Sequence, residues 1–143
     1  MKQPIEYIDI RFSVHATENS EKVESAAGHF FPGFHINEIG FRKKILKGHY
    51  GNQIKLYQAR IKTGKIIEAF IKRLSADLQK SDRETIYRDS NLLVERNNLF
   101  LRLDKQAAFK GIVRRCKYDP IHIRIHFKRK NVIEICKELG VMQ

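Results

Sequence analysis

His122, Arg124, His126 and Lys128 alternate with apolar residues near the end of the chain. Successive side chains of a β-strand point to opposite faces, so this spacing places all four on one face and the intervening isoleucines on the other. Arginine, lysine and imidazole groups bind anions such as phosphate. The pattern predicts a strand that closes a core with one face and meets an anionic ligand with the other, although a solvated polar face gives the same alternation.

The histidines of this segment do not predict a metal site. His122 and His126 would lie about 13 Å apart at about 3.3 Å per residue of a strand, whereas zinc donors lie about 2 Å from the ion. Cys116 and Cys136 are the only cysteines and form no C-x-x-C pair, so neither a thiolate site nor a disulfide framework is encoded. We expect no metal, no other cofactor and a reducing, cytoplasmic setting.

A second basic segment contains Arg42, Lys43, Lys44 and Lys47 and leads into Gly48-His49-Tyr50-Gly51-Asn52. Backbone amides at glycines can approach a phosphate closely, lysine neutralises its charge, and the loop adds imidazole, hydroxyl and amide groups from His49, Tyr50 and Asn52. The loop therefore predicts a phosphate and ribose contact. A solvated hairpin tip is the alternative.

A third candidate follows Leu103-Asp104, where a strand of alternating leucines breaks into Lys105-Gln106-Ala107-Ala108-Phe109. The small alanines would let a ligand or another backbone come near, with Lys105 and Gln106 at the end of the strand. A plain one-turn connection in which Ala107, Ala108 and Phe109 pack is the alternative.

The overall charge favours a nucleic acid or another anionic surface as partner. Lys and Arg number 28 against 16 acids, and the net charge is +12. Residues 42–75 hold ten bases and one acid, and residues 112–143 hold eight bases and three acids. If both blocks reach one surface they can neutralise several phosphates together; on opposite faces each would bind only weakly.

Catalysis and membrane binding find little support. A metal-dependent nuclease needs clustered acids, and Asp9, Glu38 and Asp104 show no recognisable spacing. No phosphate-binding loop, nucleophile elbow or zinc-protease motif is present. No segment combines a large apolar face with a strongly basic one, and no apolar run approaches the roughly 18 residues of a membrane span. We expect no catalytic residues.

The periodicity predicts an α+β fold in one domain spanning residues 1–143. Strands are expected at 5–14, 34–46, 54–61, 99–103, 112–117 and 121–128, with 34–61 forming a hairpin. Helices are expected at 23–31, at 66–78, from a capping box at 81–84 toward residue 96, and at 131–139. Such an order favours an antiparallel sheet with helices packed on one face, which leaves the other face open for binding.

Three segments carry a resemblance to a known family. They are Gly48-His49-Tyr50-Gly51-Asn52, Leu101-Arg102-Leu103-Asp104-Lys105-Gln106-Ala107-Ala108 and Asp119-Pro120-Ile121-His122-Ile123-Arg124-Ile125. Together they resemble the archaeal small RNA-binding proteins predicted as exosome subunits. The resemblance spans most of the chain, and the K-Q-A-A step after an L-x-L strand is its most specific part.

This resemblance implies a fold related to double-stranded-RNA-binding domains and to ribosomal protein L5. It also implies a cytoplasmic archaeal setting, RNA binding without catalysis and an exosome association that is itself a prediction in the family. His49, Gly51, Asn52, Lys105 and Gln106 occupy the family's marked positions, and Gly51 among them is the first candidate for a structural role.

We therefore expect a non-catalytic protein that recognises structured RNA by backbone and shape, with single-strand binding left open. The rival interpretation is an assembly subunit whose basic surface meets an acidic protein. Both depend on the basic segments meeting on one surface. The predicted RNA-binding residues are Arg42, Lys43, Lys44, Lys47, His49, Tyr50, Asn52, Lys105, Gln106, His122, Arg124, His126, Lys128, Arg129 and Lys130.

Overall fold

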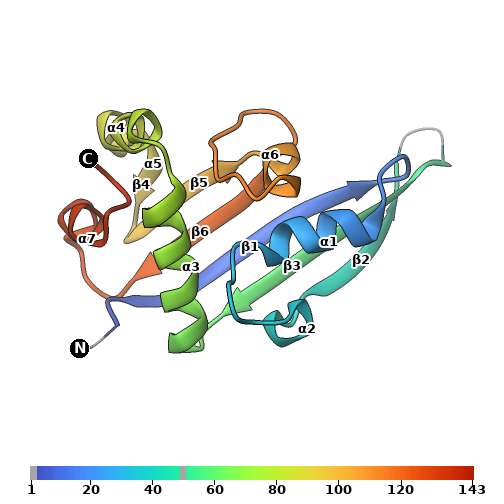
Figure 1. Cartoon of the computed structure of the whole chain (residues 1–143), viewed down its shortest axis with the longest axis horizontal. Coiled ribbons are helices and arrows are strands. Elements are labelled where there is room, and N and C mark those ends of the chain that lie inside the picture. Colours follow the sequence, from blue (N-terminus) through green and yellow to red (C-terminus); the bar gives the residue numbers. More distant parts are fainter. Residues whose placement is uncertain (1–2, 49–50) are drawn as a thin grey trace.

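Strands and helices alternate in groups along the chain, as drawn in the computed structural model of Figure 1, which describes residues 3–48 and 51–143. The strands are β1 (Ile5–His15), β2 (Arg42–Lys47), β3 (Gln53–Ile61), β4 (Val94–Glu95), β5 (Asn98–Leu103) and β6 (Ile121–Phe127). The helices are α1 (Ser20–Gly28), α2 (Ile36–Ile39), α3 (Gly64–Asp77), α4 (Lys80–Arg88), α5 (Ser90–Leu93), α6 (Lys105–Phe109) and α7 (Val132–Leu139).

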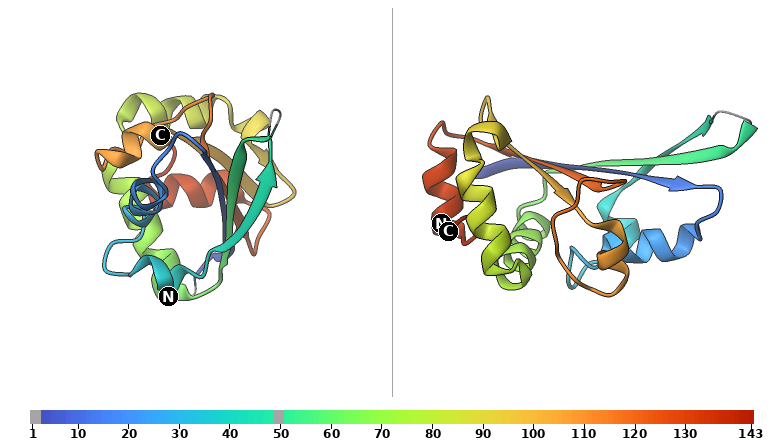
Figure 2. Two further views of the ribbon diagram at one scale, coloured as in Figure 1. Left: turned by 90° about the vertical axis from the view of Figure 1, so that its right-hand side faces the viewer. Right: turned by 90° about the horizontal axis from the view of Figure 1, so that it is seen from above.

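All six strands join one antiparallel sheet in the order β2-β3-β1-β6-β5-β4. The right-hand view of Figure 2 shows the helices gathered on one side of this sheet, while the other side carries none in the part of the chain that is described. The predicted α+β class, with helices on one face of an antiparallel sheet, is confirmed. We call the uncovered side the open face.

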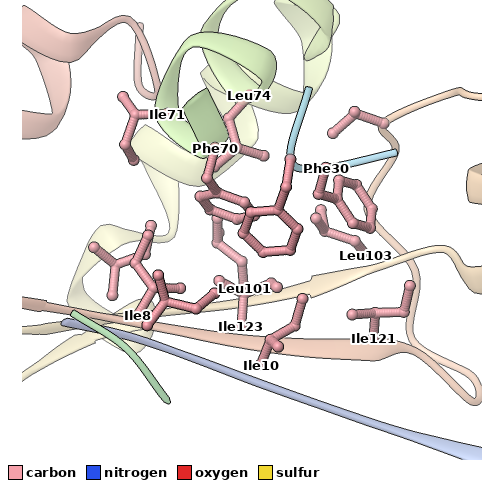
Figure 3. Packing of buried hydrophobic residues seen from close by; sticks show 14 of the residues in the cluster. Ile8, Ile10, Phe30, Phe70, Ile71, Leu74, Leu101, Leu103, Ile121 and Ile123 are labelled. Carbon is pink, nitrogen blue, oxygen red and sulfur yellow. The ribbon is translucent and has the colours of Figure 1, made fainter. Parts of the chain in front are cut away.

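Alternation along the central strands builds the core. In β1, Ile8, Ile10 and Phe12 are buried, whereas the residues between them point to the open face. Helices supply the opposing layer, and Figure 3 shows Phe30 and Phe70 beside isoleucines of the sheet. Burying one side chain of this size contributes roughly 1.5–3 kcal/mol of transfer free energy. This energy decides which face of each strand is turned toward the core.

Local signals set several helix ends as the sequence predicts. The side chain of Asn19 accepts hydrogen bonds from the backbone N–H groups of Glu21 and Lys22 and so starts α1. Gly140 ends α7 with a φ of 82°, a left-handed conformation that glycine adopts without steric cost. Asn19 and Gly140 therefore mark the start of α1 and the end of α7, as the sequence predicts.

Three expected elements differ from the structure. The strand expected at 34–46 begins only at Arg42, because His35 and Glu38 form a capping box that starts α2 and Gly40 ends it in a left-handed conformation. The helix expected to reach residue 96 stops at Arg88 and is followed by α5 and the short edge strand β4. Residues 112–117 form no strand and contribute only a single bridge from Arg115 to Leu103.

Candidate nucleic-acid interface

A row of side chains that lie opposite one another crosses the open face from β2 to β5. Residues directly opposite each other in neighbouring strands point to the same side of a sheet, so the strand register identifies its members. We call this set the cationic row. From β2 to β5 it consists of Arg42, Gln58, Arg11, His122 and Arg102. Four strand spacings of about 4.8 Å make the row about 19 Å long.

The guanidinium groups of the cationic row carry no neutralising acid. Arg42, Arg11 and Arg102 form no ion pair with any residue in the described ranges 3–48 and 51–143. Lys44 lies one register step along β2 from Arg42 on the same face, opposite Leu56, and is exposed and likewise unpaired within those ranges. The row therefore presents uncompensated positive charge to solvent.

His122 lies near the β5 end of the cationic row, between Arg11 of β1 and Arg102 of β5. It is half-buried, and this burial together with the positive charges of Arg11 and Arg102 lowers its pKa below the ordinary value of 6.5. The imidazole is therefore neutral at pH 7. In the free protein it adds a hydrogen-bonding group to the row rather than a charge.

The neighbouring row of side chains on the open face, two residues along each strand from the cationic row, carries no free charge of this kind among the described residues. Asp9 accepts two hydrogen bonds from Arg60, at 2.8 and 3.0 Å, and its carboxylate lies 4.0 Å from the Nε of Arg124. Arg124 also donates to the Tyr7 hydroxyl at 2.7 Å. Because these contacts occupy both guanidinium groups, Arg124 belongs to a neutralised network and offers less free charge than the sequence indicates.

His126 is also engaged within the protein. Its Nδ1 lies 2.7 Å from Oδ1 of Asn98, its Nε2 lies 3.3 Å from Glu6, and its ring stacks on Tyr7 at a centroid distance of 4.7 Å. Arg60 covers the Tyr7 ring from the β3 side at 4.0 Å. Both faces of the Tyr7 ring are thus occupied, which leaves Phe100, 38% exposed, as the aromatic of β5 that is open to a base.

Lys43 and Lys47 point away from the open face, contrary to their grouping with Arg42 and Lys44. Lys43 lies opposite Tyr57 on the helix side and pairs with Glu24 at 3.0 Å. Burial raises the pKa of Glu24, but hydrogen bonds from Tyr57 and Lys43 and the nearby positive charge outweigh it and lower that pKa below its ordinary value. Lys43 is therefore a neutralised contact between β2 and α1.

Lys105 is buried, so its expected contact with RNA is wrong. Its side chain is 1% exposed, and its Nζ lies 2.6 Å from Asp119, 3.0 Å from Glu18 and 2.8 Å from the carbonyl oxygen of Ser13. His15 completes the cluster at 3.2 Å from Asp119. Oxygen and nitrogen donors of His15, Glu18 and Asp119 lie close enough together to hold a metal ion, but the ammonium group already bonds both carboxylates.

The residues that follow Lys105 form the plain one-turn connection that was the alternative to a ligand contact. Ala107 and Ala108 are buried in α6, and Phe109 packs against the core. Asp104 starts the helix by accepting hydrogen bonds from the backbone of Gln106 and Ala107. Gln106 is exposed, but α6 lies in the helix layer and not on the open face (Figure 2, right).

The basic turn of Lys128, Arg129 and Lys130 lies far from the hairpin loop. Lys128 bonds to Pro4 at one end of β1, whereas Gly48 and Asn52 border a hollow lined by His15 at the other end. Eleven residues of strand separate these ends, or about 36 Å. In Figure 1 the turn follows β6 on the left and the hairpin extends to the right, so these two predicted groups do not meet.

Two of the predicted loop residues, His49 and Tyr50, lie outside the described residues. Asn52 is exposed at the base of the loop, and its carbonyl oxygen accepts the backbone N–H of Gly48. Gly51 has a φ of 78°, a conformation that favours glycine, so its place in the family pattern has a backbone explanation.

Arg11 and Arg102 were missed as candidates, although the sequence contains a signal for both. Arg11 lies between Ile10 and Phe12, and Arg102 lies between Leu101 and Leu103, so alternation alone directs both to the open face. What alternation does not give is the register that aligns them with His122. That alignment depends on strand order across the whole sheet.

The chain is similar to known proteins over most of its length. A protein-family model described as RNA binding matches residues 7–127. The chain is 35% identical over 124 residues to RNA-binding protein PAB1135 of Pyrococcus abyssi, which covers 85% of this chain and 80% of that protein. It is 33% identical over 135 residues to uncharacterized protein MJ0213 of Methanocaldococcus jannaschii, covering 88% and 89%.

Solved structures share the fold over nearly the full length. Protein AF2318 from Archaeglobus fulgidus matches with a TM-score of 0.76 at 30% identity, covering 94% of this chain and 99% of that one. Mth689, a DUF54 protein from Methanothermobacter thermautotrophicus, matches with a TM-score of 0.75 at 24% identity, covering 94% and 97%, and shows the fold alone. No helix in the described residues is long and apolar enough to cross a membrane. With its family model matched over most of its length, this chain belongs to the RNA-binding family.

Proposed function

We propose that residues 1–143 act as one non-catalytic RNA-binding domain that holds structured RNA on its open face through the cationic row and Lys44. The observation that carries this proposal is the contrast between adjacent register steps: Arg60 and Arg124 are tied to Asp9, whereas Arg42, Arg11 and Arg102 are not paired within the described residues. Unpaired guanidinium groups at spacings of about 10 Å suit successive contacts to an RNA backbone.

Recognition of backbone and shape fits the surface better than stacking of single bases. Single-strand platforms present several exposed aromatic rings, but Tyr7 is covered by Arg60 and His126, which leaves Phe100 beside Arg124. A-form RNA has a wide, shallow minor groove that displays 2′-hydroxyl groups, for which arginine and the Gln58 amide are suitable donors.

Binding of defined nucleic acids tests the proposal. We would measure by fluorescence anisotropy the affinity for an RNA duplex of about 16 base pairs, for its separate strands and for the matching DNA duplex, across a series of salt concentrations. We expect the RNA duplex to bind most tightly, and the logarithm of its affinity to fall linearly with the logarithm of the salt concentration. Tighter binding to single strands would contradict the preference for structure, and absence of salt-dependent binding would contradict RNA binding itself.

The absence of catalysis is a separate part of the proposal. Asp9 is bound to Arg60, Glu38 caps α2, and Asp104 caps α6 and pairs with Arg114 at 2.9 Å. These acids lie in different elements and each has a structural partner. Labelled RNA incubated with the protein and Mg²⁺ or Mn²⁺ is expected to stay intact, and turnover that disappears in Asp104→Asn would overturn this expectation.

A protein partner, such as the exosome, rests on the family resemblance and on one exposed edge. β2 is an edge strand, and Ile45 in it is 62% exposed, so its backbone and apolar side chain are accessible to another chain. Co-purification from the native cells, with and without ribonuclease, tests this association. An acidic protein partner would remain bound after ribonuclease treatment, whereas a link through RNA would be lost.

A further inference from the structure

The β5 end of the cationic row has the geometry of a phosphate subsite. His122 lies directly opposite Arg11 on one side and directly opposite Arg102 on the other. Such pairs place Cβ atoms about 4.5–5.5 Å apart, so both guanidinium groups can reach a single phosphate above the imidazole. The three side chains come from β1, β6 and β5, which the hydrogen-bonded sheet holds in fixed register.

Charges around this trio leave it positive. Arg124 lies next to His122 on the same face of β6 but is bound to Tyr7 and Asp9. Asp9, next to Arg11 on β1, is satisfied by Arg60. Asp119, just before β6, is satisfied by Lys105 and His15. No acid is therefore free, within the described residues, to neutralise Arg11 or Arg102.

We propose that Arg11, His122 and Arg102 form a phosphate-binding subsite in which RNA binding is coupled to the uptake of one proton by His122. This inference rests on the proposed RNA-binding function and adds its regulation by pH. No bond of the RNA changes: a proton from solvent binds a ring nitrogen, and the imidazolium then donates both N–H groups. The bound phosphate brings a negative charge next to the two guanidinium groups, whose positive charges disfavour protonation of His122 in the free protein.

The direction of the effect follows from linkage. In the free protein, burial and then Arg11 and Arg102 hold the pKa of His122 below 6.5, against the smaller opposing effect of the Asp119 carboxylate. A bound phosphate neutralises this repulsion and favours the imidazolium, so the pKa is higher in the complex. The complex binds more protons than the free protein between these two values, and RNA affinity therefore rises as pH falls through that interval.

The test is the affinity for duplex RNA at pH 8.0, 7.0, 6.0 and 5.5 at constant ionic strength. Both RNA strands should carry 5′-hydroxyl ends, because a terminal phosphomonoester titrates near pH 6 and would mimic the effect. We expect affinity to increase about fivefold between pH 8.0 and 5.5, the gain of one unit charge near a phosphate in largely aqueous surroundings. Calorimetry in two buffers of different ionisation enthalpy should show net proton uptake on binding.

Variants assign the proton to His122. His122→Gln keeps a hydrogen-bonding group and should remove the pH dependence, whereas His122→Lys carries a fixed charge and should bind tightly at every pH. His35→Asn is the matched control: His35 caps α2 in the helix layer, and asparagine preserves a cap, so its pH profile should equal that of the wild type.

The outcomes separate this inference from the proposed function. A wild-type protein that binds duplex RNA equally at all pH values, or that takes up no proton, contradicts the coupling while the RNA-binding function stands. A pH dependence that persists in folded His122→Gln also contradicts it. A wild-type protein that binds no RNA at any pH removes both proposals, and the calorimetric result on the wild type holds even if a variant fails to fold.

Discussion

Lys43 and Lys44 are consecutive in β2 but point to opposite faces of the sheet. Lys43 lies opposite Tyr57 and pairs with Glu24 at 3.0 Å, whereas Lys44 lies opposite Leu56 on the open face without an ion pair to any described residue. The two residues have the same side chain and lie in the same strand, so substituting each in turn tests which face of the sheet binds RNA.

Lys44→Ala should weaken RNA binding more than Lys43→Ala. Removal of one phosphate contact lowers the slope of log affinity against log salt by roughly one unit, and we expect this loss only for Lys44. Anisotropy titrations over a range of salt concentrations measure both slopes. Equal losses in the two variants, or a larger loss for Lys43, would be inconsistent with binding on the open face.

Asp9→Asn should tighten RNA binding. The Asp9 carboxylate holds Arg60 at 2.8 Å and lies 4.0 Å from Arg124, so its neutralisation breaks the Arg60 ion pair and removes a negative charge from the open face, while Arg124 keeps its bond to Tyr7. An increase of about threefold at low salt is expected from a surface charge of this kind. The same titration measures it, and unchanged or weaker binding by a folded variant would argue against this face.

Lys105→Met should destabilise the protein without reducing the RNA affinity of the folded fraction. The substitution keeps the unbranched apolar stem as far as Cε but leaves Glu18 and Asp119 without their shared ammonium group, at a cost of about 3 kcal/mol. Chemical denaturation measures the free energy of unfolding. Gln106→Ala, at an exposed neighbouring position, is the control and should change stability by no more than about 0.5 kcal/mol. Lost RNA affinity in a folded Lys105→Met protein would restore the direct role indicated by the family pattern.

Asp104 should contribute a stabilisation that depends on pH. Burial raises the pKa of Asp104, but its hydrogen bonds with Arg114, Ala107 and Gln106 outweigh burial and lower that pKa below 3.8. A depressed folded pKa gives stability that is complete above the unfolded value and is lost as pH falls through the folded one. Asp104→Asn keeps the cap but removes the charge, so the variant should lose about 1 kcal/mol at pH 6, with the difference shrinking as the pH falls below 3.8. A difference that is constant with pH would contradict this assignment.

Sequence periodicity predicted the elements whose information is local. Alternation identified β1 and β6, Asn19 and Gly140 marked helix ends, and the order of elements gave the sheet with helices on one face. The capping box at His35 and Glu38 was also a local signal, but it was hidden by the apolar residues Phe34, Ile36 and Ile39, which suit a strand equally well.

The site could be predicted only in part because its assembly is not local. His122 and Arg42 were expected to bind RNA, yet their alignment through Gln58 and Arg11 depends on the strand order β2-β3-β1-β6. Lys105 follows an exposed-looking polar pattern and is buried because acids distant in sequence, Glu18 and Asp119, converge on it. Similarly, Lys128 lies at the opposite end of β1 from the hairpin loop, which composition alone does not show.

The most direct measurement compares the salt dependence of duplex-RNA binding for the wild type and the double variant Arg11→Ala/Arg102→Ala. Lys22→Ala/Lys72→Ala is the matched control, since it removes two exposed charges from α1 and α3 in the helix layer. Its net charge is the same as that of the Arg11/Arg102 variant. We predict that the Arg11/Arg102 variant loses roughly two units of slope and that the control loses far less. Equal slopes for the wild type and the Arg11/Arg102 variant would contradict the cationic row as the RNA-binding surface.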